Sequence, residues 1–184
     1  EVEAAKWLRH SADQGLGAAQ YALGNIHRLG AGVPQSMAEA AKWYRRAADQ
    51  GIPEAMNNYA QSLAQGLGVR RDVREALAWF RRAAEHGQTN AMQSLAAHLA
   101  SGQFVKRDLL DAYYWAAVAE RRSKAGTVRD KAHDIRVKVE KQIPGEERQE
   151  VQHRVLEFQP AATPAPGLPP PAPPHRAPNV ASLD

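Results

Sequence analysis

The sequence predicts an all-α solenoid built from stacked helix-turn-helix pairs, and three repeating features predict it. The four tryptophans of the 184-residue chain follow one another at steps of 36 residues: Trp7, Trp43, Trp79 and Trp115. An acid stands four positions before each of them: Glu3, Glu39, Glu75 and Asp111. Two series of glycines keep the same period: Gly15, Gly51 and Gly87, then Gly30, Gly66 and Gly102. A fixed period of this length is typical of proteins whose units stack along one axis.

The first helix of each pair is predicted by an apolar stripe at helical spacing. In the unit that spans residues 37–72, this stripe consists of Ala40, Trp43, Tyr44 and Ala47, which lie on one side of a helix. Gly51 is expected to end this helix, because glycine adopts the left-handed conformation without a Cβ clash.

The second helix of the same unit is predicted to begin at Pro53, because a proline in the first turn loses no helical hydrogen bond. It carries its own stripe of Ala55, Tyr59, Ala60 and Leu63. Gly66 and Gly68 close it, and Asp72 is expected to cap the first helix of the next unit. One such hairpin cannot bury its own stripe, whereas stacked hairpins can. We therefore expect the tryptophans to fill the gaps between hairpins.

These residues resemble a known family. The segment from Glu39 to Gly51, followed by Ala55 and by Gly-Leu-Gly-Val at residues 66–69, resembles the Sel-one-like repeat, a relative of the tetratricopeptide repeat found in bacteria and eukaryotes. The resemblance covers residues 1–122 and implies a right-handed superhelix in a bacterial scaffold or adaptor, for which it slightly favours the cell envelope or periplasm over the cytoplasm. Because the chain starts with Glu1 inside a repeat, we expect the first unit to be truncated.

The last third of the chain departs from the repeat. Residues 123–159 are predicted to form capping helices, since a solenoid must shield the open end of its core. Nine of the twelve prolines lie between Pro160 and Pro178, so residues 160–184 are expected to be a disordered tail in extended conformations. This tail is interpreted as a passive linker, and residues 160–178 could alternatively bind a proline-recognising partner.

Charge and composition argue against several classes of function. The chain has 24 Lys and Arg against 20 Asp and Glu, a net charge of +4, and these charges are interspersed. We therefore expect no nucleic-acid partner. There is no cysteine and no apolar run of the roughly 20 residues that a membrane span needs. The seven histidines form no zinc-binding pattern, so we expect no metal and no cofactor.

The basic residues of the first helices are the candidate partner-binding residues. They recur with the period and would stand side by side in a stack: Lys6, Arg9, Lys42, Arg45, Arg46, Arg81 and Arg82. The resemblance to tetratricopeptide-type arrays implies that first helices line the concave face, where this ladder would meet an acidic peptide. The alternative is a solvated face, in which the arginines pair with Asp13, Asp49 and Glu85 at i+4.

The resulting hypothesis is a non-catalytic scaffold or adaptor that binds a protein or peptide on its concave face. The first alternative is a cell-envelope protein of the penicillin-interacting or β-lactamase-like type, since the family has cysteine-rich members of that kind. That chemistry needs a Ser-x-x-Lys motif, which the chain lacks. The second alternative is a weak binder of acidic polymers.

Overall fold

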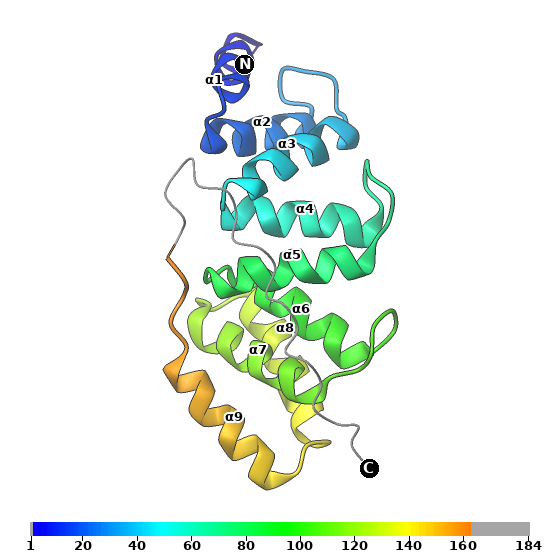
Figure 1. Cartoon of the computed structure of the whole chain (residues 1–184), viewed down its shortest axis with the longest axis vertical. Coiled ribbons are helices and arrows are strands. Elements are labelled where there is room, and N and C mark those ends of the chain that lie inside the picture. The colour runs from blue at the N-terminus through cyan, green and yellow to red at the C-terminus, as the bar shows by residue number, and fades with distance from the viewer. Residues whose placement is uncertain (1, 163–184) are drawn as a thin grey trace, which may run out of the picture.

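The computed structural model describes residues 2–162, with side chains from residue 6 onward. In this part of the chain nine helices follow one another: α1 (Val2–Asp13), α2 (Gly17–Leu29), α3 (Met37–Asp49), α4 (Pro53–Gln65), α5 (Val73–Glu85), α6 (Thr89–Ser101), α7 (Leu109–Arg122), α8 (Thr127–Glu140) and α9 (Gly145–Glu157). They stack in one column from α1 to the C-terminal helices (Figure 1). The predicted all-α superhelical solenoid is confirmed. Most of the proline-rich tail, residues 163–184, lies outside the described residues.

Helix starts and ends follow the chemistry that the sequence predicts. The first helices α3, α5 and α7 are capped by the side chains of Ser36, Asp72 and Asp108, each of which accepts a hydrogen bond from the backbone N–H three residues later. These caps satisfy N–H groups that would otherwise have no partner at a helix start. The second helices α2, α4 and α6 end at glycines in the left-handed conformation, with φ of 73°, 75° and 63° at Gly30, Gly66 and Gly102.

Packing between neighbouring units is closer than packing within one hairpin. Each second helix packs more extensively against the first helix of the next pair than against its own partner, as α4 does against α5. Alanines with no exposed surface make this possible: Ala41, Ala47, Ala48, Ala60, Ala76, Ala83, Ala84 and Ala96. Small side chains let helix axes approach, so the apolar core runs continuously along the array.

Three tryptophans are buried in the core, and the fourth is not. Trp43, Trp79 and Trp115 are 1%, 9% and 4% exposed, whereas Trp7 is 69% exposed. The expectation that Trp7 fills a gap between layers is therefore wrong. Among the described helices, α2 is the one against which α1 packs most extensively, and this packing leaves Trp7 largely in solvent.

The C-terminal helices close the lower end of the array (Figure 1). Helix α8 packs against α6 and α7, and α9 packs against α7. Arg136 of α8 joins the three helices, because it donates to Glu120 of α7 at 2.6 Å and to Glu140 at 2.7 Å, and Glu140 also accepts from Arg148 of α9 at 3.3 Å. Burial raises the pKa of Glu120, but hydrogen bonds from Arg136 and His133 outweigh it and leave the pKa below its ordinary value.

Replacing the buried Trp43 by alanine should lower the free energy of unfolding by about 3–5 kcal/mol, because the cavity lies between two layers. Trp7→Ala is the matched control and should change it by about 0.5 kcal/mol or less, since Trp7 is exposed. Urea unfolding followed by circular dichroism measures both values. Equal losses in the two variants would contradict the burial difference.

Gly68 of the loop after α4 should tolerate no side chain. Its φ is +73°, and an added Cβ would lie 2.2 Å from the backbone carbon and oxygen of Met37, at the start of α3. Gly68→Ala should therefore cost about 2 kcal/mol or more in unfolding free energy. Gly145→Ala is the control, because nothing lies within 4 Å of its added Cβ. A thermal melt in which both variants match the native chain would refute this close approach.

Candidate functional site

The basic residues predicted to bind a partner lie on the outward sides of α1, α3 and α5, which we call the ladder face. Lys6, Arg9, Lys42, Arg45 and Arg46 are exposed, and Arg81 and Arg82 are half-buried. They stand on the sides of these helices opposite the buried alanines and tryptophans. The structure thus brings the predicted residues onto neighbouring layers of the array.

Three of these arginines also cover the buried indoles. The guanidinium of Arg46 lies 4.5 Å from the ring centroid of Trp43, and that of Arg9, from the preceding unit, lies 5.4 Å from it. Arg82 lies 4.8 Å from the ring centroid of Trp79. Such a contact contributes about 0.5–1 kcal/mol at an exposed site. These contacts restrict the motion of Arg9, Arg46 and Arg82, which lowers the entropy lost when they bind a ligand.

Ion pairs on this face run both within and between units. Arg9 pairs with Asp13 at 3.4 Å, the i+4 partner expected from the sequence. Arg81 pairs instead with Asp111 of α7, in the next unit. The expected pairing of Arg81 with Glu85 is thus replaced by a contact between layers. Asp111 is the better partner because its side chain is only 21% exposed, where solvent screens the charge less.

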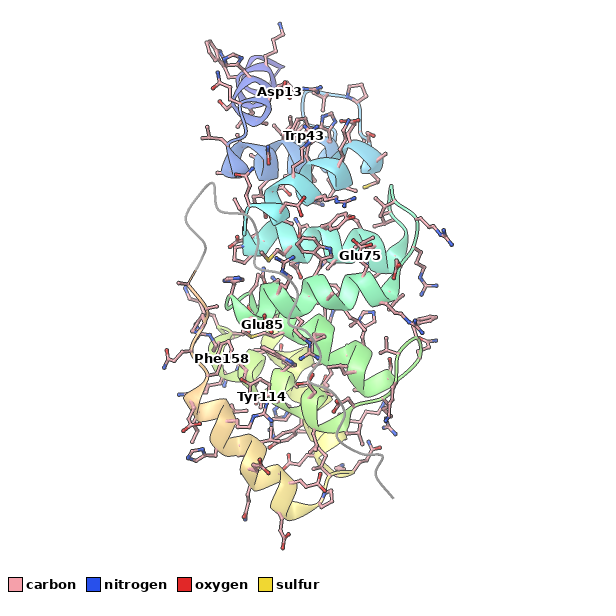
Figure 2. All side chains as sticks on the ribbon, in the orientation of Figure 1. Asp13, Trp43, Glu75, Glu85, Tyr114 and Phe158 are labelled. Carbon is pink, nitrogen blue, oxygen red and sulfur yellow. The ribbon has the colours of Figure 1, made fainter. Side chains whose placement is uncertain are left out.

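A cluster of opposite charges lies between α3 and α5. Burial raises the pKa of Asp49, while the nearby Arg45 and Arg82 lower it and Glu75 of α5 raises it. Glu75 also accepts a hydrogen bond from Nε1 of Trp79 at 3.3 Å. The ladder face is therefore a mixed surface of guanidinium groups and carboxylates. Glu75, one of these carboxylates, is labelled on α5 in Figure 2.

The fourth unit changes the chemistry of the ladder face. The positions of Lys42, Arg45 and Arg46 are taken by Tyr114, Ala117 and Val118 in α7, and α9 packs against this helix. Arg121 of α7 donates to the last carbonyl oxygens of α9, those of Val155 and Leu156, at 3.0 and 3.2 Å. A cap at this end is predicted from the sequence, but its packing against the corresponding side of α7 is not. The replacement of the basic residues by Tyr114, Ala117 and Val118 was the available signal.

A second feature that sequence reasoning missed is a cavity of about 590 Å³ among α2, α3 and α4. Its polar lining includes Asn25, Arg28, Tyr44, Asn58 and Gln61. The hydroxyl of Tyr44 donates to Oδ1 of Asn25 at 2.8 Å and accepts from Nε of Arg28 at 3.2 Å. Burial raises the pKa of Tyr44, which keeps this hydroxyl a donor. The cavity contains donors and acceptors but no carboxylate, so it lacks the paired acids of a general acid–base site.

The histidines give no metal centre in the part of the chain that the structure describes. No group of three or more His, Cys, Asp or Glu side chains that could hold a metal ion lies within residues 2–162. His27 is buried in α2, and His98 packs near Phe80 with 5.9 Å between ring centroids. Among the described helices, none is long and apolar enough to cross a membrane.

Comparisons with known proteins give a consistent result. The family model for the Sel1 repeat matches residues 1–16, 17–52, 53–88 and 89–121. The crystal structure of a Sel1 repeat protein from Oxalobacter formigenes is similar, with a TM-score of 0.70 and 27% identity over 86% of this chain and 65% of that one. So is c5321, a protective antigen of uropathogenic Escherichia coli with the SLR fold, with a TM-score of 0.60 and 25% identity over 85% of this chain. This chain thus spans 65% and 41% of the lengths of those two proteins. No curated protein matches.

Asp49→Asn should stabilise the protein at neutral pH. A carboxyl whose pKa is raised in the folded state destabilises the fold progressively as the pH rises from the ordinary pKa to the raised one, because the folded state resists ionisation. The variant lacks this destabilisation. Its free energy of unfolding should therefore exceed that of the native chain by an amount that grows with pH to roughly 0.5 kcal/mol or less, since Asp49 is exposed and its charge is screened. Urea unfolding at a series of pH values checks this, with Asp134→Asn on α8 as the control for removing one negative charge. An advantage that shrinks as the pH rises would contradict the raised pKa.

Proposed function

Because this chain belongs to the Sel1 repeat family, whose fold typically serves protein interaction, we propose that it is a non-catalytic scaffold that binds an acidic peptide or protein segment along the ladder face. In the tetratricopeptide-type arrangement this is the concave face. The observation that carries the proposal is the row of guanidinium groups on successive layers, several of which are held by an indole ring or a carboxylate. Arg46 and Arg82 are held over indole rings, and Arg81 is held by Asp111.

The chemistry of these groups favours carboxylates. A guanidinium presents a planar fork of donors that matches a carboxylate with two parallel hydrogen bonds. Arginines on successive layers would meet successive acids of an extended segment. The carboxylates on the same face, Asp49 and Glu75, would repel a segment with acids in the wrong register, so the mixed charge favours specificity.

The two other candidate functions have less support from the chain. Acylation of a penicillin-interacting protein needs a Ser-x-x-Lys motif, which is absent from the sequence. Binding of an acidic polymer by general attraction would need a cationic surface, whereas the ladder face carries acids among its arginines.

The test is binding of fluorescent peptides rich in Asp and Glu, measured by anisotropy against peptides in which Asn and Gln replace the acids. Arg45→Glu reverses one exposed charge of the ladder face and should weaken binding about tenfold, the loss of one charge-assisted contact of roughly 1.4 kcal/mol. Arg70→Glu makes the same charge change in the exposed loop after α4 and is the control.

Two outcomes would count against the ladder face. If acidic peptides bind Arg45→Glu as well as they bind the native chain, the arginine ladder is not the site. If Arg45→Glu and Arg70→Glu weaken binding equally, the attraction is a property of the net charge, and the acidic-polymer alternative gains support. Circular dichroism melts of both variants show whether the fold is retained.

A further inference from the structure

The chain continues beyond α9 as five residues without helix or strand, 158–162, which we call the strap. The strap runs back along the array to the turn between α5 and α6. There the N–H of Ala161 donates to the carbonyl oxygen of Glu85 at 2.8 Å, and Nδ1 of His86 lies 3.2 Å from the carbonyl oxygen of Ala161. Glu85, Phe158 and Tyr114 follow one another down the molecule in Figure 2. The backbone of the strap is therefore bound as an extended peptide would be.

The side chains of the strap also contact the array. Phe158 meets Trp115 and Tyr114 of α7 edge-on, with 5.9 and 6.5 Å between ring centroids. The guanidinium of Arg122 lies 5.6 Å from the centroid of the Phe158 ring. Pro160 packs against Gly87, where an added Cβ would lie 3.2 Å from it. Three features thus hold the strap: the rings of Trp115 and Tyr114, which we call the aromatic seat, the backbone surface at Gly87, and the carbonyl oxygen of Glu85.

The seat is particular to the fourth unit. In the second and third units an arginine three residues after the tryptophan covers the indole, Arg46 over Trp43 and Arg82 over Trp79. In the fourth unit this position is Val118, and Phe158 contacts the indole of Trp115. Tyr114 stands where the earlier units have Lys42 and Ala78. At the place where the strap lies, the arginine that covers the indole in the earlier units is thus absent, and aromatic side chains surround the indole instead.

The strap is separable from the core of the cap. Helices α8 and α9 bury apolar residues of their own: Ala132, Val139, Val151 and Val155. Phe158 is only partly buried and Gln159 is exposed. A short segment with one anchoring ring and few backbone hydrogen bonds opens at a lower free-energy cost than the helices behind it.

We propose that the aromatic seat of α7, together with the turn at Glu85–Gly87, is a peptide-binding site for an extended partner segment with an aromatic residue followed two positions later by proline and then a small residue. The strap, with Phe158, Pro160 and Ala161, occupies this site as an internal ligand. A partner segment of the same chemistry binds when the strap leaves the site, so competition from the strap lowers the partner's affinity. This proposal shares with the proposed function only the role of peptide scaffold, since it uses none of the ladder arginines.

The chemistry of the site explains this preference. The rings of Trp115 and Tyr114 favour an aromatic side chain that meets them edge-on. A proline holds the segment extended and packs flat on a glycine without losing a backbone donor that the site would use. The N–H of the residue after the proline then reaches the carbonyl oxygen of Glu85, as that of Ala161 does.

The test uses the full chain and a fluorescein-labelled peptide with the sequence of residues 157–163, Glu-Phe-Gln-Pro-Ala-Ala-Thr. Phe158→Ala empties the seat and should bind the peptide about tenfold or more tightly than the native chain, whose tethered strap competes at millimolar effective concentration. Ala161→Pro removes the N–H that Glu85 accepts and should raise affinity in the same direction. Gln159→Ala, which alters an exposed side chain, is the control and should bind like the native chain.

Each possible result decides the proposal. A peptide in which alanine replaces the phenylalanine must not bind, and Arg45→Glu introduced into the Phe158→Ala chain must leave binding unchanged, which separates this site from the ladder face. Equal affinity of the native and Phe158→Ala chains, or no binding by either strap variant, would overturn the inference. If the native chain sediments as a dimer that Phe158→Ala dissociates, the seat belongs to the strap of a second copy and the partner assignment is wrong.

Discussion

The structure depends on one constraint, which is that no single hairpin can bury the apolar stripes of its two helices. Alanines without exposed surface let each second helix approach the next first helix closely, and the indoles of Trp43, Trp79 and Trp115 fill the space that remains. A core formed in this way extends along the array and leaves one side of every first helix outside the stack of repeats, although α9 packs against that side of α7. That side is where a repeat protein can vary its chemistry without altering its core.

This side of the first helices changes character along the chain. On α3 and α5 it carries arginines held over indoles and next to carboxylates, and on α7 it carries Tyr114, Ala117 and Val118 beneath α9 and the strap. The same columns of the repeat thus form a polar surface in the middle of the array and an aromatic seat at its C-terminal end. One backbone arrangement thus carries two kinds of surface, because the layers fix the positions and the sequence sets the side chains.

Interactions that are local in sequence could be predicted, and those between layers could not. The cap at Asp72 and the left-handed conformation of Gly51 depend on neighbouring residues, so the sequence predicted them. The pairing of Arg81 with Asp111 joins residues 30 positions apart, and an i+4 rule cannot distinguish this partner from Glu85. The exposure of Trp7 depends on which layer lies beyond it, which the period does not specify.

Of the candidate site, only the placement of the arginines could be predicted from the sequence. The repeat period placed the arginines on one face, since period-related residues occupy equivalent positions. The strap contact joins Ala161 to Glu85, which are separated by more than two periods of the repeat, and the cavity at Tyr44 is formed by three helices together. Neither follows from spacing, because each depends on how far one layer is displaced from the next.

The extensive packing between α4 and α5, and likewise between α2 and α3 and between α6 and α7, has a consequence for how the array divides. Residues 17–52, 53–88 and 89–121, the segments that the Sel1 repeat model matches, each hold one such closely packed pair. The closely packed helix pair of this protein is therefore out of phase with the hairpin by half a repeat. Strain applied to the ends of the array would separate helices at the short turns near Gly51 and Gly87 before it parted the layers joined by the long glycine loops.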